Sequence, residues 1–295
     1  MTGILLVDKP EGTSSAGVIR ALKPLLGRER VGHLGTLDPF ASGLLPLCIG
    51  EATKVARYLL VERKTYTGTI RLGTTTDTLD RTGTVTETVP VPPIAADALA
   101  AVAARFTGPQ RQTPPMYSAL KRDGVPLYKL ARKGIEVERE ARDIEIHDLT
   151  LALRGPDSID FEVSCSKGTY VRVLAADVGR ALGTVAHLER LRRTAVGAFR
   201  IEQAATMAAL AALPPTATLP LIPIRTALAE LAAFRVPPDD LTRLRRGQQA
   251  PLLQLEPPAR PLETALLVDG DGTVAGVIES GPDRGGWRLV RLLAP

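Results

Sequence analysis

Three short segments of the chain carry residues whose types and spacing could support chemistry. The first, residues 31–54, holds His33 and Asp38 in a loop with glycines at 32, 35 and 43 and a proline at 39. A loop of this composition restricts the backbone, so it can hold two side chains in fixed positions. An Asp directly before a Pro also caps ordinary turns, and from the residues alone that alternative stays open for Asp38.

The second segment, residues 164–179, places Lys167 and Arg172 on either side of the point where a strand is expected to turn into a helix. Backbone N–H groups at such a turn, together with two cations, favour an anionic ligand. Gly168 could equally be nothing more than the turn residue. The order Ser-Lys-Gly-Thr does not match the phosphate-binding GxxxxGK[ST] pattern, which excludes a nucleoside triphosphate site of that kind.

The third segment, residues 114–134, interleaves aromatic and cationic side chains. Tyr117 and Tyr128 stand among Lys121, Arg122, Lys129, Arg132 and Lys133. Cations suit phosphates and aromatic rings suit unstacked bases, so the combination favours a single-stranded or looped RNA. Ordinary packing of two tyrosines is the alternative.

The distribution of charge supports a polyanionic partner. The whole chain has 37 Lys and Arg against 32 Asp and Glu, a net charge of +5. Residues 105–142 alone hold nine cations and four anions, which is also +5. A local basic surface on an otherwise balanced protein is typical of nucleic-acid binding, although a merely solvated surface remains the alternative.

Composition excludes several classes of protein. With 44% hydrophobic and 23% charged residues over 295 positions, the chain has globular composition and can bury a full core. Two cysteines, Cys48 and Cys165, without a CxxC pattern exclude a disulfide scaffold and a Cys-built zinc site. The three histidines show no HxH or HxxxH spacing, so we expect no metal. We find no apolar run long enough for a membrane span and no secretion signal, and we expect a soluble, cytoplasmic protein.

Hydrophobic periodicity predicts the elements that must position these residues. We expect strands at 3–9, 44–50, 65–73, 143–154 and 158–166, and helices from Ser14 or Ser15 to about Leu26, at 97–106, near 126–133 and at 171–182. Four prolines mark 213–224 as a linker. Two apolar runs around an Asp-Gly turn at 265–279 predict a hairpin in a small β-rich module.

Taken in order, the segments resemble the bacterial tRNA pseudouridine-55 synthases, the TruB-type family. The family's lysine-proline motif is matched by LLVDKPEGTSS, its catalytic loop by VGHLGTLDPFASGLLPLCIGEATK and its tyrosine motif by TYTGTIRLGTTTDTLDRTG. Its tRNA-gripping insertion is matched by QTPPMYSALKRDGVPLYKLARKG and its arginine motif by CSKGTYVRVLAADVG. The chain departs from the usual pattern at Leu34, Phe40 and Ser42, which flank Asp38.

The resemblance implies a role for each matching residue. Asp38 would be the catalytic nucleophile, Arg172 the arginine that pairs with it, and Tyr66 the tyrosine that stacks on the target base and could remove its C5 proton. His33 would fill the space that the extruded base leaves, and Lys9 would support the floor of the site. Asp77 or Asp80 would help to order it. Further substrate contacts are expected from Tyr117, Lys121, Lys129, Arg132 and Lys167.

The same resemblance implies the fold and the reaction. We expect an α+β fold, in which a mixed, mainly antiparallel sheet with flanking helices and a basic insertion at about 107–142 forms a catalytic domain, 1–224. A small β-rich, PUA-like RNA-binding domain would follow at 232–295. The activity implied is isomerisation of uridine to pseudouridine at position 55 in the T-loop of tRNA. It would proceed by base flipping, without a cofactor or metal, in a monomer that binds the T-arm.

Two alternatives from other classes are open at this point. An RNA chaperone that refolds tRNA would need the basic insertion and the C-terminal module but not Asp38. An Asp-dependent glycoside hydrolase would need a second carboxylate at hydrolase spacing and no basic clamp. The joint presence of Asp38, Tyr66 and Arg172, each within its own motif, favours the synthase.

Overall fold

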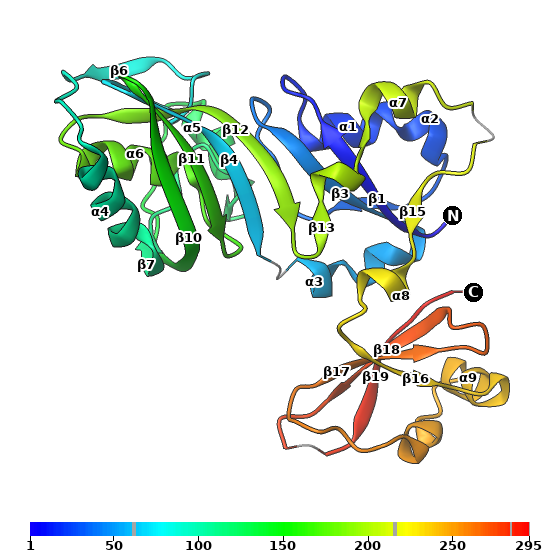
Figure 1. Cartoon of the computed structure of the whole chain (residues 1–295). Coiled ribbons are helices and arrows are strands. Elements are labelled where there is room, and N and C mark those ends of the chain that lie inside the picture. Colours follow the sequence, from blue (N-terminus) through cyan, green and yellow to red (C-terminus); the bar gives the residue numbers. More distant parts are fainter. Residues whose placement is uncertain (61–62, 215–216, 284, 295) are drawn as a thin grey trace.

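The protein is built around one large sheet, seen in a computed structural model that describes residues 1–60, 63–214, 217–283 and 285–294 (Figure 1). Its strands in the described residues are β1 (Gly3–Lys9), β2 (Val31–His33), β3 (Ser42–Ile49), β4 (Lys64–Leu72), β7 (Gly108–Gln112), β10 (Arg142–Gly155), β11 (Ser158–Cys165), β12 (Ala186–Val196), β13 (Phe199–Arg200), β14 (Ala205–Thr206) and β15 (Leu221–Ile222).

The order of these strands places β12 at the centre of the sheet. The path runs β14-β1-β3-β12-β4-β11-β10-β7. Most neighbours are antiparallel, but β1 pairs with β14 and β3 with β12 in parallel. The mixed, mainly antiparallel sheet and the helices beside it confirm the predicted α+β class. Because β12 joins the β1–β3 half to the β4–β10 half, residues from both halves meet beside it.

Helices cover one face of the sheet through a single apolar cluster, to which α4 contributes Leu99 and α6 contributes Leu174. The helices on this face are α1 (Ser15–Ala21), α2 (Lys23–Leu26), α4 (Ala96–Phe106), α6 (Val171–Ala181) and α7 (Met207–Ala211). Ser14 caps α1 by accepting a hydrogen bond from Gly17 N. The single helix expected to extend to about Leu26 is divided at Leu22, because Pro24 starts a new short helix.

Strands β1 and β3 are buried on both faces, which explains their uninterrupted apolar sequences. In β1, Leu5 and Val7 belong to the cluster under the helices, whereas Ile4 and Leu6 face a second cluster. That second cluster is covered by η1 (Gly50–Lys54), α3 (Ala56–Leu59), η2 (Ile201–Gln203), α8 (Ile224–Ala227) and the C-terminal module.

The C-terminal module, residues 232–294, is a second sheet with the order β16-β17-β18-β19 (Figure 1). Its elements are β16 (Ala232–Arg235), α9 (Pro238–Arg245), η3 (Ala250–Gln254), β17 (Thr264–Val268), β18 (Val274–Ser280) and β19 (Trp287–Leu292). β17 and β18 form the predicted hairpin. Leu267 packs under α9 and η3, but Leu266 belongs to the cluster shared with β1 and β3. The module is therefore attached through core packing, and Arg57 and Tyr58 add polar contacts to Glu279 at the edge.

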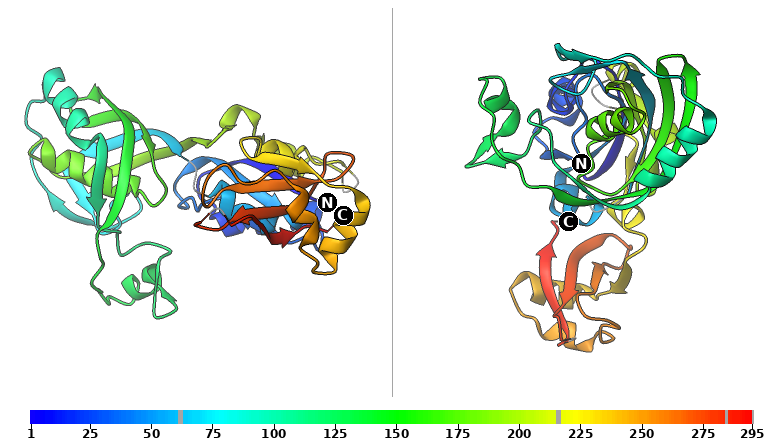
Figure 2. Two further views of the ribbon diagram at one scale, coloured as in Figure 1. Left: turned by 90° about the horizontal axis from the view of Figure 1, so that it is seen from below. Right: turned by 90° about the vertical axis from the view of Figure 1, so that its left-hand side faces the viewer.

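The basic insertion leaves the main sheet between β7 and β10. Residues 108–112 and Arg142 still pair within the sheet, so the part that stands away from it is 113–141 (Figure 2). It contains β8 (Lys121–Arg122), β9 (Val125–Pro126) and α5 (Leu127–Ala131). A second excursion, between β4 and α4, forms the hairpin β5 (Thr74–Thr76) and β6 (Val85–Thr88).

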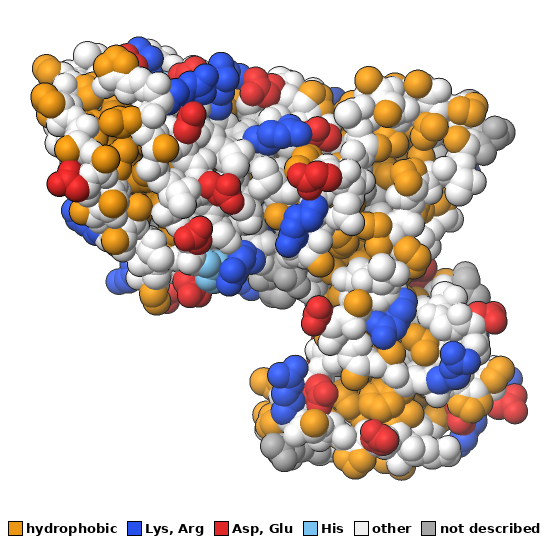
Figure 3. Space-filling view, viewed as in Figure 1, with side chains coloured by type: hydrophobic (Ala, Val, Ile, Leu, Met, Phe, Trp, Pro, Cys, Tyr) orange, Lys and Arg blue, Asp and Glu red, His pale blue; other side chains and the backbone are white. Residues whose placement is uncertain are grey.

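Elsewhere on the surface, cations and anions lie close together. Figure 3 shows one face on which acidic and basic side chains are interspersed. Several are joined in ion pairs, such as Arg71 with Asp157, Arg154 with Asp160, and Arg192 with Asp8. The insertion differs in carrying an excess of cations. In the described part of the chain, no helix is both long and apolar enough to cross a membrane.

Most sequence predictions of elements are confirmed. The strands expected at 3–9, 44–50, 65–73, 143–154 and 158–166 and the helices at 97–106 and 171–182 are present with small shifts of their ends. One difference concerns His33, which lies on the short strand β2 rather than in an open loop, because residues 31–33 pair with β3. Of the predicted linker, residues 215 and 216 lie outside the described residues.

The packing of the C-terminal module predicts unequal effects of two leucine substitutions. Leu266→Ala should lower the free energy of unfolding by about 2–4 kcal/mol, because it removes a side chain with 0% exposure from the shared cluster. Leu253→Ala in the same module, where the side chain is 86% exposed, should change it by less than about 0.5 kcal/mol. Urea denaturation measures both, and equal effects would contradict the shared core.

Candidate active site

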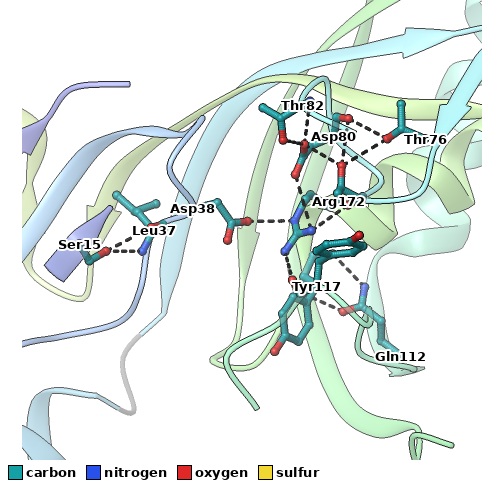
Figure 4. A network of polar contacts seen from close by, with 11 residues as sticks. Ser15, Leu37, Asp38, Thr76, Asp80, Thr82, Gln112, Tyr117 and Arg172 are labelled. Carbon is teal, nitrogen blue, oxygen red and sulfur yellow. Dashed lines mark hydrogen bonds and ion pairs between the residues drawn. The ribbon is translucent and has the colours of Figure 1, made fainter. Parts of the chain in front are cut away.

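The loop that carries Asp38 is held in place by the N-terminal segment of the chain. Ser15 accepts a hydrogen bond from Leu37 N at 2.9 Å and donates to Leu37 O at 3.2 Å (Figure 4). On the other side of Asp38, Gly12 N donates to Pro39 O at 2.7 Å. Both neighbours of Asp38 are therefore fixed by residues of the lysine-proline motif.

Lys9 contacts the same loop through its buried side chain. Its side chain is fully buried, and its ammonium group donates to Pro10 O at 2.8 Å, Thr13 O at 2.7 Å and Pro39 O at 3.4 Å. Desolvation by burial lowers the pKa of Lys9 to about 8. Lys9 therefore links the carbonyl of Pro39, next to Asp38, to two carbonyls of its own N-terminal segment.

Arg172 is the centre of the polar network. It lies in the first turn of α6 with 4% exposure, and its Nε lies 2.9 Å from Asp38 Oδ2 (Figure 4). Its Nη1 donates to Thr78 O at 2.7 Å and lies 3.6 Å from Asp80 Oδ2. Its Nη2 donates to Tyr117 O at 2.7 Å. Asp38 is therefore oriented by a guanidinium that is itself fixed from three other directions.

Asp80 is the second carboxylate of this network. It is buried, and its Oδ1 accepts hydrogen bonds from Thr78 Oγ1 at 2.9 Å, Thr82 N at 2.9 Å and Thr82 Oγ1 at 2.5 Å. Of the two acids proposed to order the site, Asp80 contacts Arg172. Asp77 instead accepts hydrogen bonds from Thr84 N and from the hydroxyl of Tyr117.

Burial raises the pKa of Asp38, and the neighbouring charge of Arg172 opposes that rise. Asp80 raises the pKa further because a second negative charge lies nearby. The Asp38 side chain nevertheless remains 37% exposed, so its carboxylate is accessible from the cavity in front of it. An oriented and accessible carboxylate can act as a nucleophile.

This cavity has a volume of about 650 Å³ and is lined by Asp38, Tyr66, Ser118, Lys167, Arg172 and Arg193, among others. That volume lies in the usual range for ligand sites, about 300–1,000 Å³. Tyr66, on β4, is 8% exposed, and burial raises the pKa of its hydroxyl. The structure therefore brings together the three residues expected to be catalytic, Asp38, Tyr66 and Arg172.

His33 lies on β2 and is half-buried. Burial lowers its pKa, and the positive charge of Arg193 adds to this effect. Its Nδ1 is buried and has no hydrogen-bond partner among the described residues. The His33 side chain does not line the cavity in front of Asp38.

The other expected substrate contacts are divided between the cavity and the insertion. Lys167 is exposed and lines the cavity, and Tyr117 lies where the insertion reaches Arg172. Lys121, Lys129 and Arg132 are carried by the insertion, and the Arg132 guanidinium lies 5.5 Å from the centre of the Tyr128 ring.

The three departures from the family pattern do not enter the cavity. Leu34 has 0% exposure and belongs to the cluster that includes the C-terminal module, whereas Phe40 belongs to the cluster under the helices. Ser42, at the start of β3, borders a separate open groove on the sheet. The departures therefore change packing around the loop rather than groups that face Asp38.

Sequence reasoning did not identify Arg193, which lines the cavity from β12. The strand β12 carries several charged residues in succession, so its sequence alone did not indicate that the Arg193 side chain is the buried one. The described residues contain no group of three or more His, Cys, Asp or Glu side chains placed to bind a metal ion.

Comparison with known families identifies the family of this chain. Residues 23–171 match the TruB family pseudouridylate synthase (N terminal domain), and residues 172–217 match the tRNA pseudouridylate synthase B C-terminal domain. The chain belongs to the TruB family. It is therefore a pseudouridine synthase, an isomerase.

Curated relatives of this TruB-family chain cover most of its length. A tRNA pseudouridine synthase B of Aromatoleum aromaticum is 46% identical over 279 residues, which is 94% of this chain and 88% of the relative. One of Azoarcus sp. is 47% identical over 248 residues, 84% and 82% of the two chains. One of Opitutus terrae is 50% identical over 225 residues, 76% and 93% of the two chains.

Solved structures share the fold of the TruB-family chain at low identity. A chain of a Cbf5-Nop10-Gar1 complex superimposes with a TM-score of 0.73 at 22% identity and covers 99% of this chain and 85% of the other. A chain of an H/ACA RNP bound to a substrate RNA gives 0.70 at 19% identity, with 99% and 85% coverage. These likenesses include the C-terminal module and support the fold alone.

The electrostatics of Asp38 predict the pH dependence of any reaction that needs its ionised form. An ordinary aspartate has a pKa of about 4. Because burial raises the pKa of Asp38, the acidic limb of the rate profile should lie at a higher pH than that. Arg172→Gln removes the opposing positive charge, so the limb should move to still higher pH. The pH profile of kcat/KM measures this shift. Arg180→Gln, on the same helix and paired with Asp177 on the surface, is the control and should leave the limb in place.

Proposed function

We propose that this chain isomerises uridine 55 in the T-loop of tRNA to pseudouridine, with Asp38 as the nucleophile. The observation that carries the proposal is the Arg172–Asp38 pair, which holds an accessible carboxylate at a cavity lined by Tyr66. The names of the curated relatives, tRNA pseudouridine synthase B, support tRNA as the substrate. The T-loop position is implied by the resemblance of the motifs.

The reaction requires cleavage of the bond between C1′ and N1, rotation of the uracil and formation of a bond between C1′ and C5. N1 gains a proton and C5 loses one, so the product is an isomer and no oxidant or reductant is consumed. A carboxylate suits this chemistry because it is anionic and can add covalently or stabilise positive charge on the sugar. Arg172 keeps Asp38 charged and directed at the substrate.

The uridine must leave the folded T-loop before Asp38 can reach it. Extrusion costs a few kcal/mol of stacking, which contacts in the new pocket offset. Tyr66 lines the cavity. We assign to its ring the stacking on the extruded base and to its hydroxyl the acceptance of the C5 proton. We assign to the His33 side chain the role of filling the space that the base leaves in the T-loop. We assign to Lys9 the role of supporting the loop that carries Asp38.

The cations of the insertion supply the binding energy for the T-arm. Lys121, Lys129 and Arg132 reach solvent and are suited to phosphates. Tyr117 connects this clamp to the site, since its carbonyl accepts a hydrogen bond from Arg172. Docking of RNA on the insertion would therefore act directly on the residue that orients Asp38.

Tritium release from tRNA that carries [5-³H]uridine tests the proposal, because the C5 hydrogen must leave when pseudouridine forms. The intact protein should release tritium from position 55. Asp38→Asn should abolish the release and still bind tRNA, since it removes the charge but keeps the shape. Tight, salt-sensitive tRNA binding by both proteins without any release would overturn the catalytic function and leave the chaperone.

The role of the clamp is tested by the salt dependence of binding. Replacing Lys121, Lys129 and Arg132 together by Ser should weaken tRNA binding and reduce the slope of log Kd against log salt by about 2–3, because about one counterion is released per phosphate contact. Filter binding over a series of salt concentrations measures the slope. The control replaces Arg71, Arg154 and Arg192, which are paired on the sheet, and should leave the slope unchanged.

A further inference from the structure

Arg193 is a fully buried cation at the junction of the two halves of the sheet. It lies on β12 with 0% exposure, opposite Gly43 of β3 and opposite Tyr66 of β4 in the strand register. Among the described residues, no carboxylate lies within ion-pair distance of it. A buried charge without an opposite charge is costly, so its presence needs an explanation other than stability.

Two of the three guanidinium nitrogens hold the catalytic loop and the strand that follows it. Nη2 donates to Gly35 O at 3.1 Å, and Nε donates to Leu44 O at 2.7 Å. Gly35 and Leu44 lie on either side of Asp38 in the sequence. Gly35 also lies close to the third nitrogen, because a Cβ at this position would stand 3.4 Å from Arg193 Nη1. Arg193 thus ties the loop to the central strand.

The third nitrogen, Nη1, is buried and has no hydrogen-bond partner among the described residues. Arg193 also lines the cavity in which the proposed chemistry takes place. A guanidinium can only donate hydrogen bonds and does not lose its proton at physiological pH. A buried donor at the wall of a reaction cavity therefore needs an acceptor that the site or its substrate provides.

The hydroxyl of Tyr66 is an acceptor that the fold places on the same face as this donor. Directly opposite residues on antiparallel strands carry their side chains on the same face, with Cβ atoms about 4.5–5.5 Å apart. The Arg193 guanidinium, as a charge and as a donor, also opposes the rise in the pKa of Tyr66 that burial causes. Hydrogen bonds of this kind are often loose in a free enzyme and tighten when the substrate binds.

We propose that Arg193 is a positioning residue for the isomerisation, which holds the hydroxyl of Tyr66 through Nη1 while its other two nitrogens hold the loop that carries Asp38. The inference rests on the proposed function. Because the guanidinium can only donate, it occupies one lone pair of the hydroxyl oxygen and leaves the other lone pair available to the C5 proton of the base. One buried cation thereby sets the distance between the nucleophile and the aromatic ring that holds the target base.

A double-mutant cycle with Tyr66→Phe separates this role from a purely structural one. Arg193→Lys keeps the charge but cannot make three directed contacts, so the single-turnover rate of tritium release should fall about tenfold or more. In the Tyr66→Phe background, Arg193→Lys should have a much weaker effect and lower the rate only about twofold, because the hydroxyl that Arg193 holds is absent. An equal fall in both backgrounds would overturn the proposal.

The control for the cycle is the neighbouring residue Arg192. Its side chain points to the other face of the sheet and pairs with Asp8 at 3.1 and 2.8 Å. Arg192→Lys should leave the single-turnover rate unchanged within about twofold. A fall in rate as large as that of Arg193→Lys would mean that any change in β12 slows the reaction, and it would overturn the specific role of Arg193.

A second measurement needs no variant of Arg193 and so remains decisive if Arg193→Lys does not fold. Because the contact tightens when substrate binds, loss of the accepting hydroxyl leaves a buried donor unsatisfied in the complex, so Tyr66→Phe should lower the Tm of the tRNA-bound protein by about 2 °C or more. An unchanged or higher Tm would overturn the contact. Absence of tritium release from the intact protein would overturn the proposed function instead, whatever the melting experiment shows.

Discussion

The ion pair between Arg172 and Asp38 is the interaction on which the rest of the site depends, because its geometry is assembled from four separate segments. The guanidinium comes from α6 and the carboxylate from the loop before β3, while Asp80 and the carbonyls of Thr78 and Tyr117 complete the set of partners. The two negative charges share one buried cation, which limits the rise in the pKa of Asp38 that burial alone would cause. Movement of any segment would change the direction of the nucleophile.

The sheet makes this assembly possible because its central strand approaches both neighbours closely. A Cβ on Gly43 would stand 2.3 Å from Arg193 O, and one on Gly68 would stand 2.2 Å from Arg190 O. Only glycine is compatible with such distances, so β12 can lie tightly between β3 and β4. The catalytic loop leads into β3 at this junction, and Tyr66 stands beside it on β4. Two halves of the chain therefore meet at one cavity.

Most elements of the fold could be predicted from sequence, since periodicity and capping act locally. The run at 3–9 indicated a strand and the run at 44–50 a buried strand, and both are buried on two faces. What periodicity could not indicate was the partner on each face. The run at 265–268 is apolar because one face packs under α9 and the other against the main sheet, and such contacts join residues that are far apart in the chain.

For the site, the sequence by itself determined the residue types and their motifs, and the resemblance of these motifs to the TruB-type family pointed to Asp38, Tyr66 and Arg172. The glycines and proline around Asp38 and the cations of the insertion are local features. Local features can be recognised in the sequence because they do not depend on contacts with distant segments. Only the tertiary structure decided that Asp80 rather than Asp77 reaches Arg172, that Lys9 binds three carbonyls, and that Arg193 lies opposite Tyr66. The reason is physical: these contacts depend on the register of strands and the course of loops, and both are set by packing between segments that are distant in the sequence.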